Sequence, residues 1–273
     1  MNMKIKTVTS YLESIAPLSL QEEYDNSGLL IGNEENEVLG VLICLDCTEA
    51  VLDEAVKKNC SLIIAHHPII FKGLKKIIGR NYVERVTEKA IRNNISIYAI
   101  HTNLDNVSAG VNKKICEKLG LQNCKILLPS PSGKNFGAGM IGTLATPSTE
   151  IFLLNKIKKS MKVSSLRHTT LLNKKVSKVA VCGGSGSFLL EEVIRQKADV
   201  FVTADFKYHQ FFDAENKVLI ADIGHYESEQ FTKELLRDLL MKKFSIFATR
   251  LTKGEKKIPL YLTAINTNPI NYL

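Results

Sequence analysis

The sequence predicts an α/β fold of two lobes, in each of which helices cover a mostly parallel sheet. Three observations lead to this prediction. Short apolar runs with the length of buried strands alternate along the chain with stretches of helical length. A segment at residues 128–142, punctuated by prolines and glycines, indicates a lobe boundary or a long loop. The 273 residues are also enough for two lobes of ordinary size.

The first part of the chain contains clear signals for the ends of its elements. Pro17 ends the first helix, Thr48 can cap the second, and Gly120 ends the last. Pro68 prevents a regular strand from continuing past residue 67. The predicted helices cover residues 7–16, 49–58, 83–93 and 111–119, and the predicted strands cover residues 38–45, 61–65 and 95–100.

The second part of the chain repeats the alternation of strand and helix. The predicted helices cover residues 151–161, 188–197 and 227–243, and the predicted strands cover residues 176–182, 200–203 and 218–223. We assign residues 1–125, together with roughly 245–273, to the first lobe. Residues 126–244 are assigned to the second lobe.

Composition limits the possible functions. The net charge of +8 could attract nucleic acid or an anionic small molecule such as a nucleotide, but the basic residues are scattered, so we interpret most of them as solvated surface. Cys44 and Cys47 form a C-x-x-C without a second pair, and we interpret all six cysteines as reduced packing residues. No signal peptide is visible and no run approaches the ~20 apolar residues that cross a bilayer. We therefore expect a cytoplasmic protein that does not bind membranes.

Histidines follow three of the predicted strands, each near a carboxylate. His66 and His67 end the first of these runs, while His101 precedes Asp105 and His225 precedes Glu229 by four residues each. Each pair alone has a structural explanation: Asp105 could form a turn, and Glu229 could complement a helix N-terminus. Because ligands bind at the carboxyl ends of parallel strands, the set as a whole predicts a divalent-metal site.

The number of candidate ligands suits two metal ions better than one. Imidazole and carboxylate together fit Zn, Mn, Fe or Co. Glu229 is the best candidate for a bridge, because a carboxylate has two oxygens, whereas an imidazole offers one lone pair to a metal. His101 is predicted to orient a ligand. Two further segments each have two possible roles. Residues 183–187 form either a tight turn or a phosphate contact, and residues 205–209 form either a surface turn or part of the site.

Motifs along nearly the whole chain match a known pattern. The chain resembles the Nif-three-like family of dinuclear-metal hexameric proteins, many members of which are labelled GTP cyclohydrolase type 2 homologues. The resemblance rests on the motifs Tyr24-Asp25-Asn26-Ser27-Gly28, Ala65-His66-His67-Pro68, His101-Thr102-Asn103-Leu104-Asp105, Gly137-Ala138-Gly139-Met140-Ile141-Gly142, Cys182-Gly183-Gly184-Ser185-Gly186-Ser187, Asp205-Phe206-Lys207-Tyr208-His209, Gly224-His225-Tyr226-Glu227-Ser228-Glu229 and Asn268-Pro269-Ile270-Asn271-Tyr272.

The resemblance implies two divalent ions per chain, in a dinuclear site between the two lobes. It implies one ion held by His67 and Asp105, a second held by His66 and His225, and Glu229 touching both. It also implies a toroidal homohexamer. The sequence departs from the family pattern at Tyr24, Met140 and Ala204, and none of these departures removes a ligand.

Two hypotheses for function follow. The first is a hydrolase that opens the ring of a purine nucleotide, plausibly GTP, with metal-bound hydroxide as the nucleophile and with Glu229 and His101 as catalytic residues. The basic residues Lys72, Lys75, Lys76 and Arg80 could steer a triphosphate toward it. The second is a non-catalytic hexameric metal-binding scaffold or regulator that recruits a protein or nucleic acid, because the sequence shows no unambiguous general acid.

Overall fold

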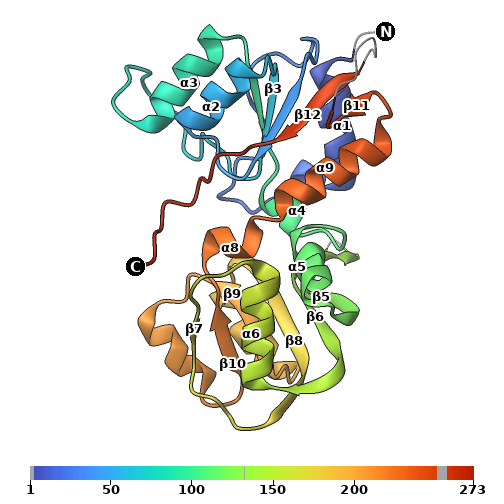
Figure 1. Cartoon of the computed structure of the whole chain (residues 1–273), viewed down its shortest axis with the longest axis vertical. Helices are drawn as coiled ribbons and strands as arrows, with labels where there is room; N and C mark the ends of the chain where they lie inside the picture. Colours follow the sequence, from blue (N-terminus) through green and yellow to red (C-terminus); the bar gives the residue numbers. More distant parts are fainter. Residues whose placement is uncertain (1–2, 132, 251–256) are drawn as a thin grey trace. The chain divides into compact units, whose positions relative to one another are not determined.

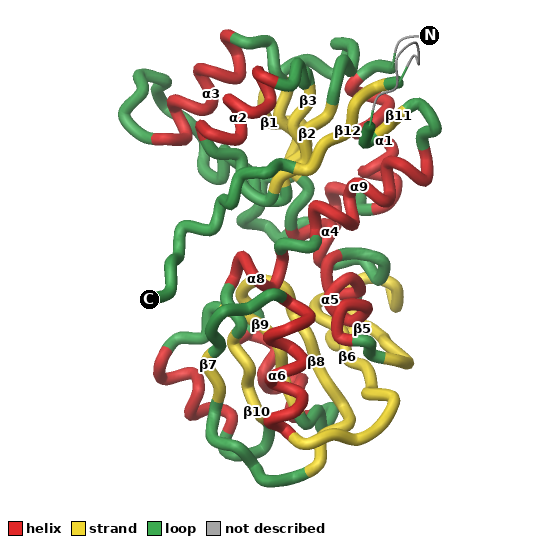
Figure 2. The backbone as a smooth tube through the Cα atoms, viewed as in Figure 1, coloured by secondary structure: helices red, strands yellow, loops and turns green. Residues whose placement is uncertain are grey.

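The computed structural model describes residues 3–131, 133–250 and 257–273. The chain folds into two compact units (Figure 1). The first unit consists of Met1–Leu104 and Thr232–Pro269, and the second consists of Asp105–Phe231 and Ile270–Leu273. Figure 2 shows the predicted alternation of strands and helices in both units. Within the described residues, no helix is both long enough and apolar enough to cross a membrane.

The first unit is built on a six-stranded sheet in the order β1-β4-β3-β2-β12-β11. β1 pairs antiparallel with β4, and the other neighbouring pairs are parallel, as predicted. All four residues of β2, β3 and β4 are buried, which explains their continuous apolar sequences. The strands are β1 (Gly28–Ile31), β2 (Val41–Cys44), β3 (Leu62–Ala65), β4 (Ser96–Ala99), β11 (Phe247–Ala248) and β12 (Ile258–Leu262).

Helices cover both faces of this sheet (Figure 1). Apolar residues of α2 and α3 join a core cluster with β2, β3 and β4, while α9 packs against β2 and β12. The Thr48 cap is confirmed, because its hydroxyl accepts a hydrogen bond from the Val51 amide. The helices are α1 (Ile5–Ile15), α2 (Glu49–Lys57), α3 (Tyr82–Arg92), α4 (Thr102–Asp105) and α9 (Thr232–Lys243), with a 3-10 turn η1 (Leu18–Leu20).

The second unit is built on a six-stranded sheet in the order β5-β6-β8-β9-β10-β7. β8, β9 and β10 are parallel, but β5, β6 and β7 pair antiparallel with their neighbours. The prediction of a mostly parallel sheet is therefore wrong for this unit, which has a mixed sheet. The strands are β5 (Gln122–Ser130), β6 (Gly133–Thr149), β7 (Arg167–His168), β8 (Lys175–Ser185), β9 (Val200–Ala204) and β10 (Leu219–Asp222).

In the glycine-rich segment, residues 128–130 and 133–142 belong to the paired strands β5 and β6, so the predicted lobe boundary or long loop is wrong there. Its glycines allow β5 and β6 to pair closely. A Cβ at Gly137 would lie 2.1 Å from the carbonyl oxygen of Leu128, and a Cβ at Gly142 would lie 2.7 Å from the sulfur of Cys124. Glycine therefore marks close packing across a strand pair here, rather than a turn.

Helices also cover both faces of the second sheet (Figure 1). α5 packs with α6 and against β8, while α7 and η3 join a core cluster with β5, β8, β9 and β10. The elements are α5 (Val111–Leu119), α6 (Glu150–Met161), η2 (Ser187–Leu189), α7 (Leu190–Arg195), η3 (Tyr208–Ala214) and α8 (His225–Glu229).

The boundaries between the units differ from the predicted ones. Residues 105–125 belong to the second unit because α5 packs on β6 and β8, so Asp105 lies in that unit. Residues 232–244 belong to the first unit because α9 packs on β2 and β12. The single helix predicted at 227–243 is therefore wrong: α8 and α9 are separate helices that pack on different sheets.

Gly32 provides a test of the first sheet. It has φ +109°, and a Cβ there would lie 2.0 Å from the Oγ of Ser96 and 2.8 Å from its Cα. We expect Gly32→Ala to lower the free energy of unfolding by about 1–3 kcal/mol, because neither the backbone angle nor the space suits a side chain. Urea denaturation followed by circular dichroism measures the effect. Gly73→Ala is the control, since no atom lies within 4 Å of its added Cβ; equal stability of the two variants would contradict the prediction.

Candidate metal centre

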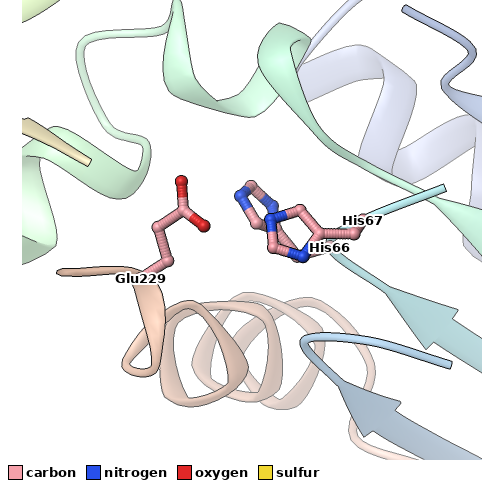
Figure 3. A group of neighbouring side chains, drawn as sticks. All are labelled: His66, His67 and Glu229. Atoms are coloured by element: carbon pink, nitrogen blue, oxygen red, sulfur yellow. The ribbon is translucent and has the colours of Figure 1, made fainter. Parts of the chain in front are cut away.

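Three imidazoles gather at one edge of the first sheet. β3 and β4 are parallel neighbours, so the residues that follow them emerge at the same edge. The ring centroids of His66 and His67 are 5.0 Å apart, and that of His101 is 5.4 Å from His66 and 5.3 Å from His67. The structure thus confirms within this unit that the His pair and His101 lie together (Figure 3 draws the His pair).

Oxygen atoms fix the orientation of the first two rings. The Nδ1–H of the fully buried His66 donates to the carbonyl of Ile100 at 2.8 Å. The Nδ1–H of His67 donates to the carboxylate of Asp46 at 2.7 Å, and Asp46 also accepts from the hydroxyl of Thr267 at 2.8 Å. Each bond selects the tautomer whose lone pair is on Nε2, the usual state of a metal-ligating imidazole.

His101 is oriented by a buried carboxylate. Its Nδ1–H donates to Asp25 at 2.7 Å, and Asp25 also accepts from the amide of Thr102 at 3.1 Å and from its hydroxyl. Burial would raise the pKa of the Asp25 carboxyl, but the hydrogen bonds from His101 and Thr102 outweigh burial and hold this pKa well below its usual range. Asp25 is therefore an anion that holds the His101 ring in place.

The second unit contributes an imidazole and a carboxylate from one short helix. His225 and Glu229 lie one turn apart on α8, with His225 Nε2 3.1 Å from Glu229 Oε2, and His225 Nδ1 lies 2.7 Å from Asp205. Burial would lower the pKa of His225, but the hydrogen bonds with Asp205 and Glu229 raise it to about 11. Without a metal, a proton occupies the position between the Nε2 of His225 and Glu229. The carboxylate of Glu229 is drawn in Figure 3.

Asp222, the last residue of β10, holds the loops that carry Asp205 and His225. Its carboxylate accepts from the Phe206 amide at 3.0 Å, from the Gly224 amide at 3.2 Å and from the guanidinium of Arg167. Phe206 follows Asp205, and Gly224 precedes His225. The buried carboxylate of Asp222 therefore sets the positions of both Asp205 and His225, which are hydrogen-bonded to each other.

The glycines after the apolar part of β8 make room for Glu229. A Cβ at Gly184 would lie 2.5 Å from Glu229 Oε1 and 3.3 Å from the His225 ring. The amides of Gly183 and Gly184 donate to Asn112 and Ser228, each at 2.9 Å. These two amides already bind protein side chains, so they do not support the predicted phosphate contact at residues 183–187.

Asp105 and Glu229 both act on the thiol of Cys182 in the second unit. The buried thiol of Cys182 has a raised pKa, first because of burial and then because of the negative charges of Asp105 and Glu229. The carbonyl of Asp105 accepts from the Asn112 side chain at 3.1 Å, which links Asp105 to α5 within the second unit. Within the second unit, three predicted ligands, Asp105, His225 and Glu229, therefore belong to one region around the end of β8.

Sequence reasoning assigned no role to two carboxylates that orient imidazoles. Asp46 lies between Cys44 and Cys47 of the C-x-x-C pattern, and all six cysteines in the described chain are free thiols. Asp25 belongs to one of the motifs on which the family resemblance rests. Its position in the sequence could have indicated the role of Asp46. Asp46 follows β2, the strand next to β3, just as His66 follows β3.

The fold and these side chains define an α/β protein with oriented imidazoles and carboxylates at the ends of parallel strands. The family model Duf34/NIF3 (NGG1p interacting factor 3) matches residues 3–256, and the chain belongs to this family. The predicted resemblance is therefore confirmed.

Relatives match over most of their length. The "GTP cyclohydrolase 1 type 2 homolog" of Clostridium acetobutylicum is 38% identical over 231 residues, which cover 84% of this chain and 86% of the relative. The Campylobacter jejuni protein of the same name is 32% identical over 276 residues, covering 99% and 100%. Crystal structures of a Staphylococcus aureus hypothetical protein (33% identity, 100% of both chains) and a Bacillus cereus protein related to NIF3 (27%, 100% of this chain and 99% of that one) both superpose with a TM-score of 0.90.

Proposed function

We propose that this protein is a metal-dependent hydrolase that binds two divalent ions and opens the ring of a purine nucleotide such as GTP. The observation that carries the proposal is the orientation of His66, His67 and His225. The Nδ1 of each ring lies 2.7 or 2.8 Å from an oxygen of a carbonyl or carboxylate, so that Nε2 is the ligand atom. Hydrogen bonds of this kind are typical of metal-ligating histidines.

The donor set of the two units fits the proposed ions. Imidazole nitrogen and carboxylate oxygen suit Zn, Mn, Fe or Co. His66 and His67 are candidate ligands from the first unit, and Glu229 is a candidate ligand from the second. In line with the family resemblance, one ion would be held by His67 and Asp105 and the other by His66 and His225, and Glu229 would contact both. The proton on His225 would leave when a cation binds, because the cation takes its place beside Glu229.

The protein's own groups would position the substrate and move protons. Divalent ions bound by these ligands would lower the pKa of a coordinated water and so supply a nucleophile at neutral pH. His101 has its Nδ1 held by Asp25, which leaves Nε2 as the atom that can accept a proton and return it to the substrate. The net charge of +8 favours an anionic substrate.

The names of the relatives support a nucleotide substrate, since several are called GTP cyclohydrolase 1 type 2 homolog. On the basis of family membership, we also propose a toroidal homohexamer that acts in the cytoplasm. No protein or nucleic acid partner is required for the proposed chemistry.

The test is a turnover assay on protein of known metal content. Protein is stripped with a chelator, loaded separately with Zn, Mn, Fe and Co, and incubated with GTP while formate release is measured. We expect formate only from loaded protein, at a rate that rises with bound metal. Protein that holds two ions per chain but turns over neither GTP nor other nucleotides would refute the hydrolase and favour the metal-binding scaffold.

A further inference from the structure

Two exposed aromatic rings adjoin the imidazole cluster of the first unit. The ring centroid of Phe71 lies 6.2 Å from that of His101 in an edge-on arrangement, and the ring of Tyr24 lies 6.1 Å from Phe71. Both are largely open to solvent, with 44% of Phe71 and 65% of Tyr24 exposed. The three rings form a continuous row from solvent to the His cluster.

The backbone that carries these rings is firmly held. Asp25, next to Tyr24, binds His101 and Thr102. The side chain of Asn26 donates to the carbonyl of Ile70, the residue before Phe71, at 2.6 Å. The same short loop therefore fixes both the imidazole of His101 and the segment that presents Phe71. Because the backbone beside both rings is held in this way, less conformational entropy is lost when a ligand binds to them.

We propose that Tyr24 and Phe71 form the binding face for the planar base of a nucleotide, with the base next to His101. This inference rests on the proposed function and names the contact that recognises its substrate. Stacking suits such a ligand because every nucleobase has a π-face and aromatic side chains offer a matching one. The exposed Lys72, Lys75 and Lys76 follow Phe71 in the chain and would attract the phosphates.

The experiment separates recognition of the base from attraction of the charge. Binding of GTP and of inorganic tripolyphosphate is measured by isothermal titration calorimetry on metal-loaded wild-type protein and on Phe71→Leu and Tyr24→Ala. We expect each variant to bind GTP roughly 5- to 150-fold more weakly, because stacking contributes roughly 1–3 kcal/mol per base. Binding of tripolyphosphate and the metal content should not change.

The matched control is Phe212→Leu. Phe212 is an exposed aromatic residue of the second unit, 67% accessible, and lies on η3. This variant should bind GTP like the wild type. Circular dichroism of each variant confirms that it is folded, and Phe71→Leu keeps an apolar side chain at the position.

The outcomes distinguish this inference from the proposed function. Weaker GTP binding by Phe71→Leu in a protein that releases no formate would sustain the base site and refute the hydrolase. Unchanged GTP affinity in both folded variants, or wild-type protein that binds tripolyphosphate as tightly as GTP, would overturn the base site even if GTP is hydrolysed.

Discussion

Glu229→Gln is expected to weaken binding of at least one metal ion by roughly 100-fold and to abolish formate release. Replacing a group that merely orients a ligand costs 10- to 100-fold in metal affinity, so the loss of a charged ligand should cost at least the upper value. Glutamine keeps the size of the side chain but removes the negative charge that the proposed bridge needs. Elemental analysis and metal titration measure the change.

Glu227→Gln is the matched control for this variant. Glu227 lies on the same helix, α8, and is 7% exposed, compared with 2% for Glu229. The control removes the charge of another buried carboxylate about half a turn away on the same helix and should retain both ions. If Glu229→Gln binds metal as tightly as the wild type, Glu229 is not a ligand, and the proposed centre is wrong.

Asp25→Ala is expected to lower the free energy of unfolding by about 3 kcal/mol or more, because each buried donor that loses its acceptor costs about 1–3 kcal/mol. The substitution leaves the Nδ1–H of His101 and two donors of Thr102 without their acceptor. The side chain of Asp25 is fully buried, so water cannot replace it without rearrangement. Chemical denaturation measures the loss.

The pH dependence of stability gives this prediction a second test. The pKa of Asp25 is depressed in the folded protein. Its stabilising contribution is therefore complete above the unfolded value of about 3.9 and disappears as the pH falls through the lower folded value. The gap between wild type and Asp25→Ala should be constant from pH 8 to about pH 5 and narrow below that.

Asp53→Ala is the control for Asp25→Ala. Asp53 pairs with Lys89, but 63% of its side chain is exposed. An exposed ion pair is screened by water, so its loss should cost no more than about 1 kcal/mol. Equal effects of the two substitutions would mean that the hydrogen bonds of Asp25 do not stabilise the fold.

The elements with strong local signals were predicted well. α5 spans Val111–Leu119 as predicted, because an apolar face and Gly120 define it locally. β3 ends before His66 and β4 ends before His101, since Pro68 and the apolar runs fix those ends. The errors at residues 128–142 and 227–243 have a different origin. The pairing of β5 with β6 and the break between α8 and α9 both depend on packing against residues that are distant in the sequence.

In the candidate metal centre, too, some features follow from the local sequence and others only from the tertiary structure. The sequence alone determined that this is an α/β protein whose histidines follow buried strands, because strand length, apolar runs and breaker residues are local properties. Only the tertiary structure decided which oxygen orients each ring. His101 is hydrogen-bonded to Asp25, 76 residues away, and His67 is hydrogen-bonded to Asp46, 21 residues away. Such pairs depend on which strands lie side by side, and strand order follows from the packing of the whole sheet rather than from any short stretch of sequence.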